Sequence, residues 1–349
     1  MKTLILHNII SSNSVYRLAS LIKQKEKNWG EVRVLFCAQT EENRRWNLRE
    51  KITFVYKVMP GWAVKLRGKD LFTYFVNPSI TKELSEFNPD RLVISGWDLF
   101  AYQIAYWWGW RHKKEIIIYS DSTSGEKSWR RTVSRPLVRV FVKVASGYIA
   151  AGTRARAYLM SLGAKEERVE IFQLDVNKGY FMKEAAKYKG QREQTKKSLG
   201  IKSKYNLLFV GQLIERKGIM DLLKAYKKIA ANPSWGLVIV GYGQLEEEIS
   251  TFISDNQLER VTLLGTVEQY DLPKIYTATD CLVLPSLQEA WGLVVNEALY
   301  CGLSVIVSDM CGCGPDLVKT GENGYIYQTG NEVSLLEAIN KIIKRYDEK

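Results

Sequence analysis

Histidine and cysteine are scarce in this sequence, and those present are poorly spaced for metal binding. Only two histidines and five cysteines occur among 349 residues, and no two cysteines stand at CxxC spacing. Cys311 and Cys313 alone are too few for a structural zinc site, which needs four ligands. We therefore expect no structural metal, and the odd number of cysteines favours a reducing, cytosolic compartment.

Long apolar runs are also missing, with one case to consider. LVISGWDLFAYQIAYWWGW, residues 92–110, is just long enough to span a bilayer. It contains Asp98 and Gln103, and Ser95-Gly96 interrupts it like a turn. We expect a buried strand followed by a helix. The first 21 residues lack a small-residue cleavage site, so we interpret them as a strand and a helix rather than a signal peptide.

Acidic residues are depleted in the first part of the chain. Residues 1–200 hold 36 Lys and Arg against 19 Asp and Glu (36 − 19 = +17), and residues 201–349 hold 14 against 19 (14 − 19 = −5). The net charge of +12 thus belongs to the N-terminal part. Such asymmetry is typical of proteins that bind nucleic acid or an anionic membrane surface, and a solvated basic face is the alternative.

The order of apolar runs indicates two α/β domains. Short β-rich runs alternate with longer helical segments in both halves, and near-continuous apolar strands of this kind are typical of parallel sheets covered on both faces. The runs lie at 3–9, 32–39, 52–58, 91–97, 115–121 and 146–152, then at 206–213, 236–243, 261–267, 281–287 and 303–309. We predict two doubly wound, Rossmann-like domains facing a central cleft, with ligands at the carboxyl ends of their strands. The basic segment 177–200 is expected to hold a linker and the first helix of the second domain.

Two glutamates frame a predicted helix start near the end of the chain. The strand at 281 ends at Pro285, LQEAWG is the turn, and a helix should run from about Gly292 to Tyr300. Free amides in the first turn of a helix bind anions. Glu289 before this helix and Glu297 inside it are hydrogen-bond acceptors that bracket the anion site. A nucleotide sugar, with hydroxyls on both sides of a diphosphate, has the matching layout.

A pair of basic residues follows another predicted strand end. QLIERKG comes after the strand that ends at Gly211, and a helix should begin at about Ile219. Arg216 and Lys217 would then neutralise a leaving diphosphate. The sequence has no DxD motif to hold Mg2+, so we expect metal-independent charge stabilisation and no cofactor apart from the nucleotide-sugar donor.

Together these features resemble retaining glycosyltransferases of family 4, which have the GT-B fold. The resemblance rests on the E-x7-E motif made by Glu289 and Glu297 and on the stretches 209–226, 238–249, 261–309 and 321–331. It implies that Glu289, with Arg216 and Lys217, serves the reacting end of the donor, and that Glu297 holds the ribose. The remaining donor-binding positions that it implies are Gly211, Gln212, Gly241, Val267, Ala290, Trp291, Gly292, Leu293 and Val294.

The sequence departs from the pattern of this family at two positions. Gln212 stands where the family commonly has arginine, and Arg216 beside Lys217 is the expected substitute. Asp121 stands roughly where the family often carries a histidine near the donor sugar, so either Asp121 takes that role or the site is altered. In the first domain, Ser11 and Ser12 either donate hydrogen bonds to phosphate or only cap the next helix.

These residues predict a metal-independent retaining hexosyltransferase. It would transfer a hexose, with a glucose-type sugar as the leading candidate, from a UDP-sugar to a polysaccharide or lipid-linked saccharide. Residues 1–185 would bind the acceptor and 186–349 the donor. The alternatives are a GT-B nucleotide-sugar epimerase, a non-catalytic nucleotide-sugar binder, or a basic nucleic-acid-binding protein. The sparse histidines argue against the epimerase, and no known nucleic-acid-binding motif is present, so no nucleic-acid partner is expected.

One basic and aromatic surface is predicted in the first domain. Residues 127–144 place Arg131, Arg135 and Arg139 at helical spacing among apolar residues, and AYWWGWRHKK adds three tryptophans beside further cations. This composition suits peripheral docking on anionic lipid at the inner face of the membrane, where each cation contributes about 1 kcal/mol. A core aromatic helix with solvated basic edges is the alternative.

Overall fold

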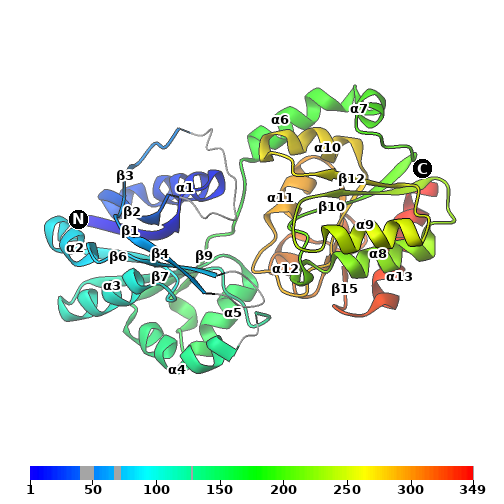
Figure 1. Ribbon diagram of the computed structural model, residues 1–349. Coiled ribbons are helices and arrows are strands. Elements are labelled where there is room, and N and C mark those ends of the chain that lie inside the picture. The colour runs from blue at the N-terminus through cyan, green and yellow to red at the C-terminus, as the bar shows by residue number, and fades with distance from the viewer. Residues whose placement is uncertain (40–50, 67–71, 127–128, 349) are drawn as a thin grey trace. The chain divides into compact units, whose positions relative to one another are not determined.

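The computed structural model describes residues 1–39, 51–66, 72–126 and 129–348. The chain divides into two compact units, Met1–Leu174 and Asp175–Lys349 (Figure 1). This division lies earlier in the chain than the predicted boundary at 185/186. The assignment of acceptor and donor binding to the two domains stays a prediction.

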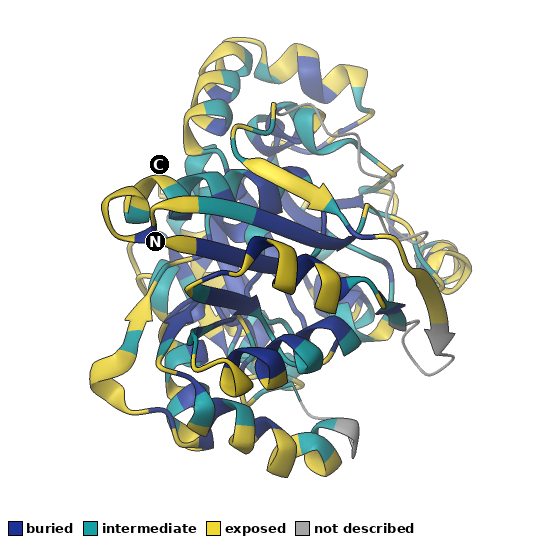
Figure 2. Cartoon of the chain, turned by 90° about the vertical axis from the view of Figure 1, so that its left-hand side faces the viewer, coloured by how far each residue is buried: buried dark blue, intermediate teal, exposed yellow. Residues whose placement is uncertain are grey.

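The first unit is built on a parallel seven-stranded sheet with the order β3-β2-β1-β6-β7-β8-β9. Its strands are β1 (Lys2–Ile9), β2 (Glu31–Ala38), β3 (Val55–Val58), β6 (Arg91–Ser95), β7 (Glu115–Ser120), β8 (Gly147–Ala150) and β9 (Val169–Ile171), and a separate antiparallel hairpin consists of β4 (Trp62–Leu66) and β5 (Phe72–Val76). Its helices are α1 (Ser12–Trp29), α2 (Ile80–Phe87), α3 (Phe100–Arg111), α4 (Trp129–Val144) and α5 (Thr153–Leu162). Figure 2 shows buried strands with helices beside them whose outer sides are exposed.

The second unit has a parallel six-stranded sheet with the order β12-β11-β10-β13-β14-β15. Its strands are β10 (Tyr205–Val210), β11 (Trp235–Val240), β12 (Val261–Gly265), β13 (Cys281–Leu284), β14 (Ser304–Ser308) and β15 (Gly324–Tyr327). Its helices are α6 (Lys178–Lys189), α7 (Arg192–Ser198), α8 (Ile219–Ile229), α9 (Glu246–Asp255), α10 (Leu272–Ala278), α11 (Leu293–Tyr300), α12 (Gly314–Leu317) and α13 (Glu332–Asp347). The strand order reverses between β10 and β13, which in such sheets is where ligands bind.

Most predicted strands are present, and the segment 92–110 forms β6 and α3 as expected. Among the described residues, no helix combines the length and the apolar content needed to cross a bilayer. The run at 52–58 yields only the short strand Val55–Val58, and β4, β5, β9 and β15 were not among the predicted strands. The segment 177–200 forms two helices, α6 and α7, and α6 packs against α10 and α11.

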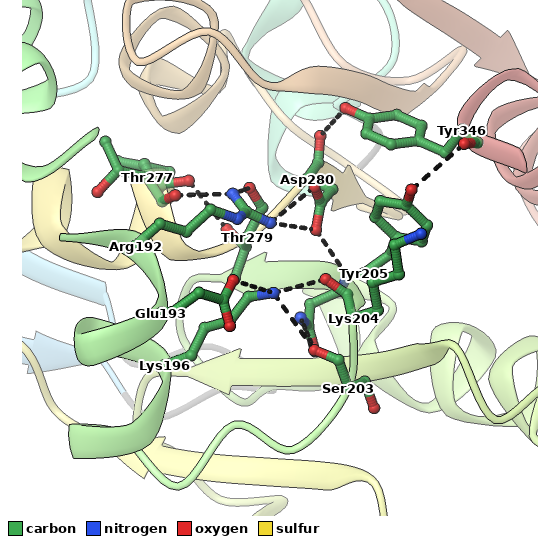
Figure 3. A network of polar contacts seen from close by, with 12 residues as sticks. Arg192, Glu193, Lys196, Ser203, Lys204, Tyr205, Thr277, Thr279, Asp280 and Tyr346 are labelled. Atoms are coloured by element: carbon green, nitrogen blue, oxygen red, sulfur yellow. Dashed lines mark hydrogen bonds and ion pairs between the residues drawn. The ribbon is translucent and has the colours of Figure 1, made fainter. Parts of the chain in front are cut away.

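A polar network fixes α7 to the amino end of the second sheet (Figure 3). Arg192 pairs with both carboxylate oxygens of Asp280 at 2.8 Å and also donates to the carbonyls of Thr277 and Thr279. Asp280 in turn accepts a 2.8 Å hydrogen bond from the backbone amide of Asn206, at the start of β10. A buried carboxylate is tolerated when it is paired and hydrogen-bonded in this way. The network therefore stabilises the amino ends of the strands, opposite to the carboxyl ends where ligands are predicted to bind.

Candidate donor-binding site

The predicted donor-binding residues gather at the carboxyl ends of four neighbouring strands. Gly211 and Gln212 follow β10, Gly241 follows β11, and Val267 lies just after β12. The residues from Glu289 to Val294 span the end of the loop after β13 and the first two residues of α11. Because β10 and β13 pair directly, the basic loop and the glutamate-bearing loop meet where the strand order reverses. The structure thus brings together residues that are far apart in the sequence.

Two glycines allow these loops to approach one another closely. A Cβ atom on Gly218 would lie 2.0 Å from the carbonyl oxygen of Pro285, and its φ of +67° also disfavours other residues. A Cβ atom on Gly241 would lie 1.8 Å from the carbonyl oxygen of Gly211. Side chains at either position would push the loops apart. Gly218 therefore lets the two basic residues before it lie close to the end of β13, and Gly241 lets the loops after β10 and β11 approach each other.

Lys217 and Glu289 form the central ion pair of the site. The Lys217 ammonium donates a hydrogen bond to a carboxylate oxygen of Glu289, and the Ser286 hydroxyl donates to the same oxygen at 3.2 Å. Arg216 donates to the carbonyl of Gln288 at 3.2 Å. Burial by itself raises the pKa of Glu289, but Lys217, Arg216 and Ser286 together hold this pKa below its ordinary value. Glu289 is therefore a carboxylate at neutral pH, able to accept further hydrogen bonds.

The backbone around the start of α11 is held in place by the segment that follows β14. The amides of Gly312 and Cys313 donate to the carbonyls of Glu289 and Trp291 at 2.9 and 3.0 Å. Gly292 adopts a φ of +101° directly before the helix. The predicted helix from about Gly292 to Tyr300 is confirmed, with Leu293 as its first residue. Its first-turn amides and its dipole favour an anion at this end.

Glu297 lies on α11, about one turn into the helix, and is buried. Tyr276 donates a 2.7 Å hydrogen bond to one carboxylate oxygen and Gln269 a 2.9 Å hydrogen bond to the other. Burial raises the pKa of Glu297 to about 7, against the lowering effect of these two hydrogen bonds. Each oxygen keeps a further lone pair that can accept a hydrogen bond. Tyr276 and Gln269 lie in the stretch 261–309 that carries the family resemblance, but their spacing did not indicate hydrogen bonds to Glu297.

A second set of contacts, which the sequence did not predict, anchors α11 through Asn296 and Tyr300. Asp175 accepts hydrogen bonds from Asn296 at 3.1 Å and from the Tyr300 hydroxyl at 2.8 Å. The other end of the Asn296 side chain accepts a 2.9 Å hydrogen bond from the indole of Trp291. Asp175 is the first residue of the second unit. It therefore ties the beginning of this unit to the helix that carries Glu297 and, through Asn296, to Trp291.

The three candidate residues of the first unit stand at strand ends of their own sheet. Ser11 follows β1 and caps α1, since its hydroxyl accepts from the amide of Ser14 at 3.1 Å while the Ser14 hydroxyl accepts from the amide of Ser11. The capping role is thus confirmed, and phosphate binding stays a prediction. Ser12 is buried at the start of α1, and Asp121 is exposed directly after β7. The predicted role of Asp121 near the donor sugar also stays a prediction.

The described residues contain no cluster of three or more His, Cys, Asp or Glu arranged to hold a metal ion. Near the start of α11, the cationic groups are the guanidinium of Arg216 and the ammonium of Lys217, which contact Gln288 and Glu289. Charge of this kind suits a diphosphate. The expectation that catalysis is metal-independent stays a prediction.

Comparison with solved structures identifies the fold. The structure of HepE from Anabaena in complex with UDP superposes with a TM-score of 0.73, at 18% identity, covering 99% of this chain and 91% of that chain. The predicted fold class, GT-B with two doubly wound α/β domains, is confirmed. At this level of identity the likeness concerns the fold and not the chemistry.

Sequence comparisons concern mainly the second unit. Residues 191–349 match the family of glycosyl transferases group 1. The chain is 30% identical over 150 residues to an uncharacterized glycosyltransferase of Methanocaldococcus jannaschii, covering 42% of this chain and 38% of that protein. It is 30% identical over 135 residues to the O-antigen chain mannosyltransferase B of Escherichia coli, covering 38% and 34%. The chain thus spans less than two fifths of the length of these curated relatives. Both relatives are named as glycosyltransferases, and neither is an epimerase or a nucleic-acid-binding protein.

Proposed function

We propose that the protein is a retaining hexosyltransferase that transfers a glucose-type hexose from a UDP-sugar to a polysaccharide or a lipid-linked saccharide. The observation that carries this proposal is the arrangement of Glu289, Lys217 and Glu297 around the start of α11. A charged carboxylate and a buried one lie on the two sides of a helix start that favours an anion.

Each group has a distinct proposed role in holding the donor. Glu289 accepts hydrogen bonds from the hexose hydroxyls, and Arg216 and Lys217 bind the diphosphate with the amides of Trp291 to Val294. Glu297 accepts hydrogen bonds from the ribose. The loop after β12, which contains Val267, contacts the base. The backbone of Gly211 and Gly241, at the carboxyl ends of β10 and β11, lies against the donor.

The proposed chemistry is substitution at the anomeric carbon with retention. The bond from this carbon to the diphosphate oxygen breaks as the acceptor oxygen bonds to the same face, and the acceptor proton passes to the departing phosphate. The protein aligns the two reactants and stabilises the negative charge that develops on the diphosphate. Arg216 and Lys217 supply this stabilisation without a metal ion. EDTA should therefore leave the rate of transfer unchanged.

UDP is the proposed nucleotide because HepE, which shares the fold, is solved with UDP and with UDP-glucose. A saccharide acceptor is supported by the name of the O-antigen chain mannosyltransferase B.

Calorimetric titration with UDP, GDP and ADP tests the donor site. Wild-type protein should bind UDP selectively, and Glu297→Ala should lose most of this affinity because the buried acceptor is gone. Glu259→Ala is the matched control, since Glu259 is an exposed glutamate of the same unit. Absence of binding to all three nucleotides would refute the proposal. Loss of binding in both variants would show that the effect is not specific to Glu297.

A further inference from the structure

Helix α4 presents two apolar faces, of which only one is covered. Val138 and Val142 are buried against the first unit. Val133, Leu137 and Val140 lie on another face, because residues three and four apart share one side of a helix. Val133 is 70% exposed, and Leu137 and Val140 are about half exposed. A regular amphipathic helix of a soluble protein has one apolar face, so the exposed stripe requires a partner.

Helix α3 adds two exposed indoles beside α4. The rings of Tyr106 and Phe141 stack at 4.5 Å between centroids, which places the two helices next to each other. Trp107 and Trp110 are 57% and 60% exposed. Large aromatic side chains are normally among the most buried residues. Trp110 lines the same hollow as Val144 at the end of α4, so the exposed apolar surface extends from α4 to α3.

The same surface is strongly basic. Helix α4 contains five cations and no acidic residue, and Arg135, Arg139 and Lys143 on it are exposed. Where α3, β7 and α4 meet, a hollow of about 500 Å³ is lined by Trp110, Arg111, Lys113, Lys114, Ile116 and Val144. Three of these six residues are cations, and the others are apolar. The hollow therefore matches an anionic group attached to an apolar one.

We infer that this surface of α3 and α4 docks on a bilayer that contains anionic phospholipid. The valine, leucine and tryptophan side chains enter the boundary between headgroups and acyl chains, and the cations contact the headgroup phosphates. The hollow takes one phosphate headgroup. A second copy of the chain fits poorly, because a twofold contact would oppose the same cations. Nucleic acid leaves the aliphatic stripe on α4 unpaired.

Flotation with vesicles tests this inference without any substrate. Wild-type protein should float with vesicles of 70% phosphatidylcholine and 30% phosphatidylglycerol, remain unbound with pure phosphatidylcholine, and be partly released by salt. Arg139→Glu combined with Lys143→Glu should lower the partition coefficient at least tenfold, since each cation near such a surface accounts for about fivefold. Val133→Asp should lower it about tenfold by removing an apolar contact and adding a like charge to the lipid.

Matched variants in the second unit control for general effects. Val333 is 63% exposed on α13, and Val333→Asp should leave flotation unchanged. Lys224→Glu, at an exposed lysine of α8, should do so apart from its small effect on net charge. All variants change exposed residues, and UDP titration of each reports the donor site separately. A failure of UDP binding with intact flotation would therefore refute the proposed function and not the docking surface.

Three results would overturn the inference. Wild-type protein that ignores anionic vesicles would do so directly. Equal loss of flotation in the Val133→Asp and Val333→Asp variants would show that the surface is not the one described. Salt-dependent binding of a DNA duplex in a gel-shift assay, with no binding to vesicles, would assign the basic surface to nucleic acid.

Discussion

Replacing Glu297 by glutamine should stabilise the second unit above neutral pH, although it removes a proposed ligand group. Burial raises the pKa of this carboxyl from 4.5 to about 7 in the folded protein. At about 1.4 kcal/mol for each pKa unit, full ionisation of the buried group costs the folded state about 3 kcal/mol. Glutamine has nearly the same shape and no charge, so it avoids this cost.

The sign of the pH dependence follows from proton binding. Between pH 4.5 and 7 the folded protein holds the Glu297 proton more firmly than the unfolded chain does. The contribution of this group to the free energy of unfolding is therefore full below pH 4.5 and is lost as the pH rises towards 7 and above. Glu297→Gln has no such loss. Tyr276 can still donate to the amide oxygen of the new side chain, and Gln269 can turn its own amide to accept.

Urea unfolding at pH 5 and pH 8, followed by circular dichroism, measures the effect. The change in unfolding free energy from pH 5 to pH 8 is measured for wild type and for Glu297→Gln. Subtracting the second change from the first cancels the contributions of the other titrating groups. We expect about 2–3 kcal/mol over this interval. Two compact units need not unfold in one transition, so each transition is fitted separately. No difference in any transition would refute the reasoning about the buried carboxyl.

Three further predictions concern the same unit. Gly218→Ala should lower the free energy of unfolding by more than the roughly 1–2 kcal/mol that a left-handed backbone alone costs, because the new Cβ meets the Pro285 carbonyl. Gly200→Ala, at a φ of +71° with open space around it, should cost only this conformational part. Chemical denaturation compares the two variants, and equal losses would contradict the close contact at Gly218. Arg192→Met should lower the free energy of unfolding by about 3 kcal/mol, because it leaves the buried Asp280 carboxylate unpaired. The additional change Asp280→Leu should recover much of this loss. Denaturation that shows no loss in Arg192→Met would mean that the pair contributes little to stability. UDP affinity should rise up to about tenfold from pH 6 to pH 8 as Glu297 ionises around pH 7. Calorimetry of wild type and Glu297→Gln measures this rise, and the pH dependence that remains in the variant gives the share due to the nucleotide.

The elements around the site follow from local patterns in the sequence. The run NLLFVG forms β10 and CLVL forms β13, since continuous apolar runs bounded by glycine or proline suit buried parallel strands. The turn residues before α11 and α8 also marked the starts of these helices correctly. The starts and ends of strands and helices depend on neighbouring residues, so they can be predicted from a single sequence.

Contacts between distant segments could not be predicted in the same way. The hydrogen bonds of Glu297 with Tyr276 and Gln269 depend on how α10 and its preceding loop pack on α11. The contacts of Asp175 with Asn296 and Tyr300 span more than a hundred residues. Their existence depends on tertiary packing, and no residue pattern records it. The pKa of Glu297 follows from that packing and was equally out of reach.

The ion pair between Lys217 and Glu289 also bears on how the second unit folds. Its two residues are 72 positions apart. Lys217 follows β10 and Glu289 follows β13, so the pair can form only when these two strands pair. A chain that has formed β10, β11 and β12 therefore contains the lysine without its carboxylate partner. Closing so long a loop is an entropically unfavourable step that local structure cannot replace. The anion-binding end of α11 is thus completed only when the two halves of the sheet join, and nucleotide capture during refolding would report that event.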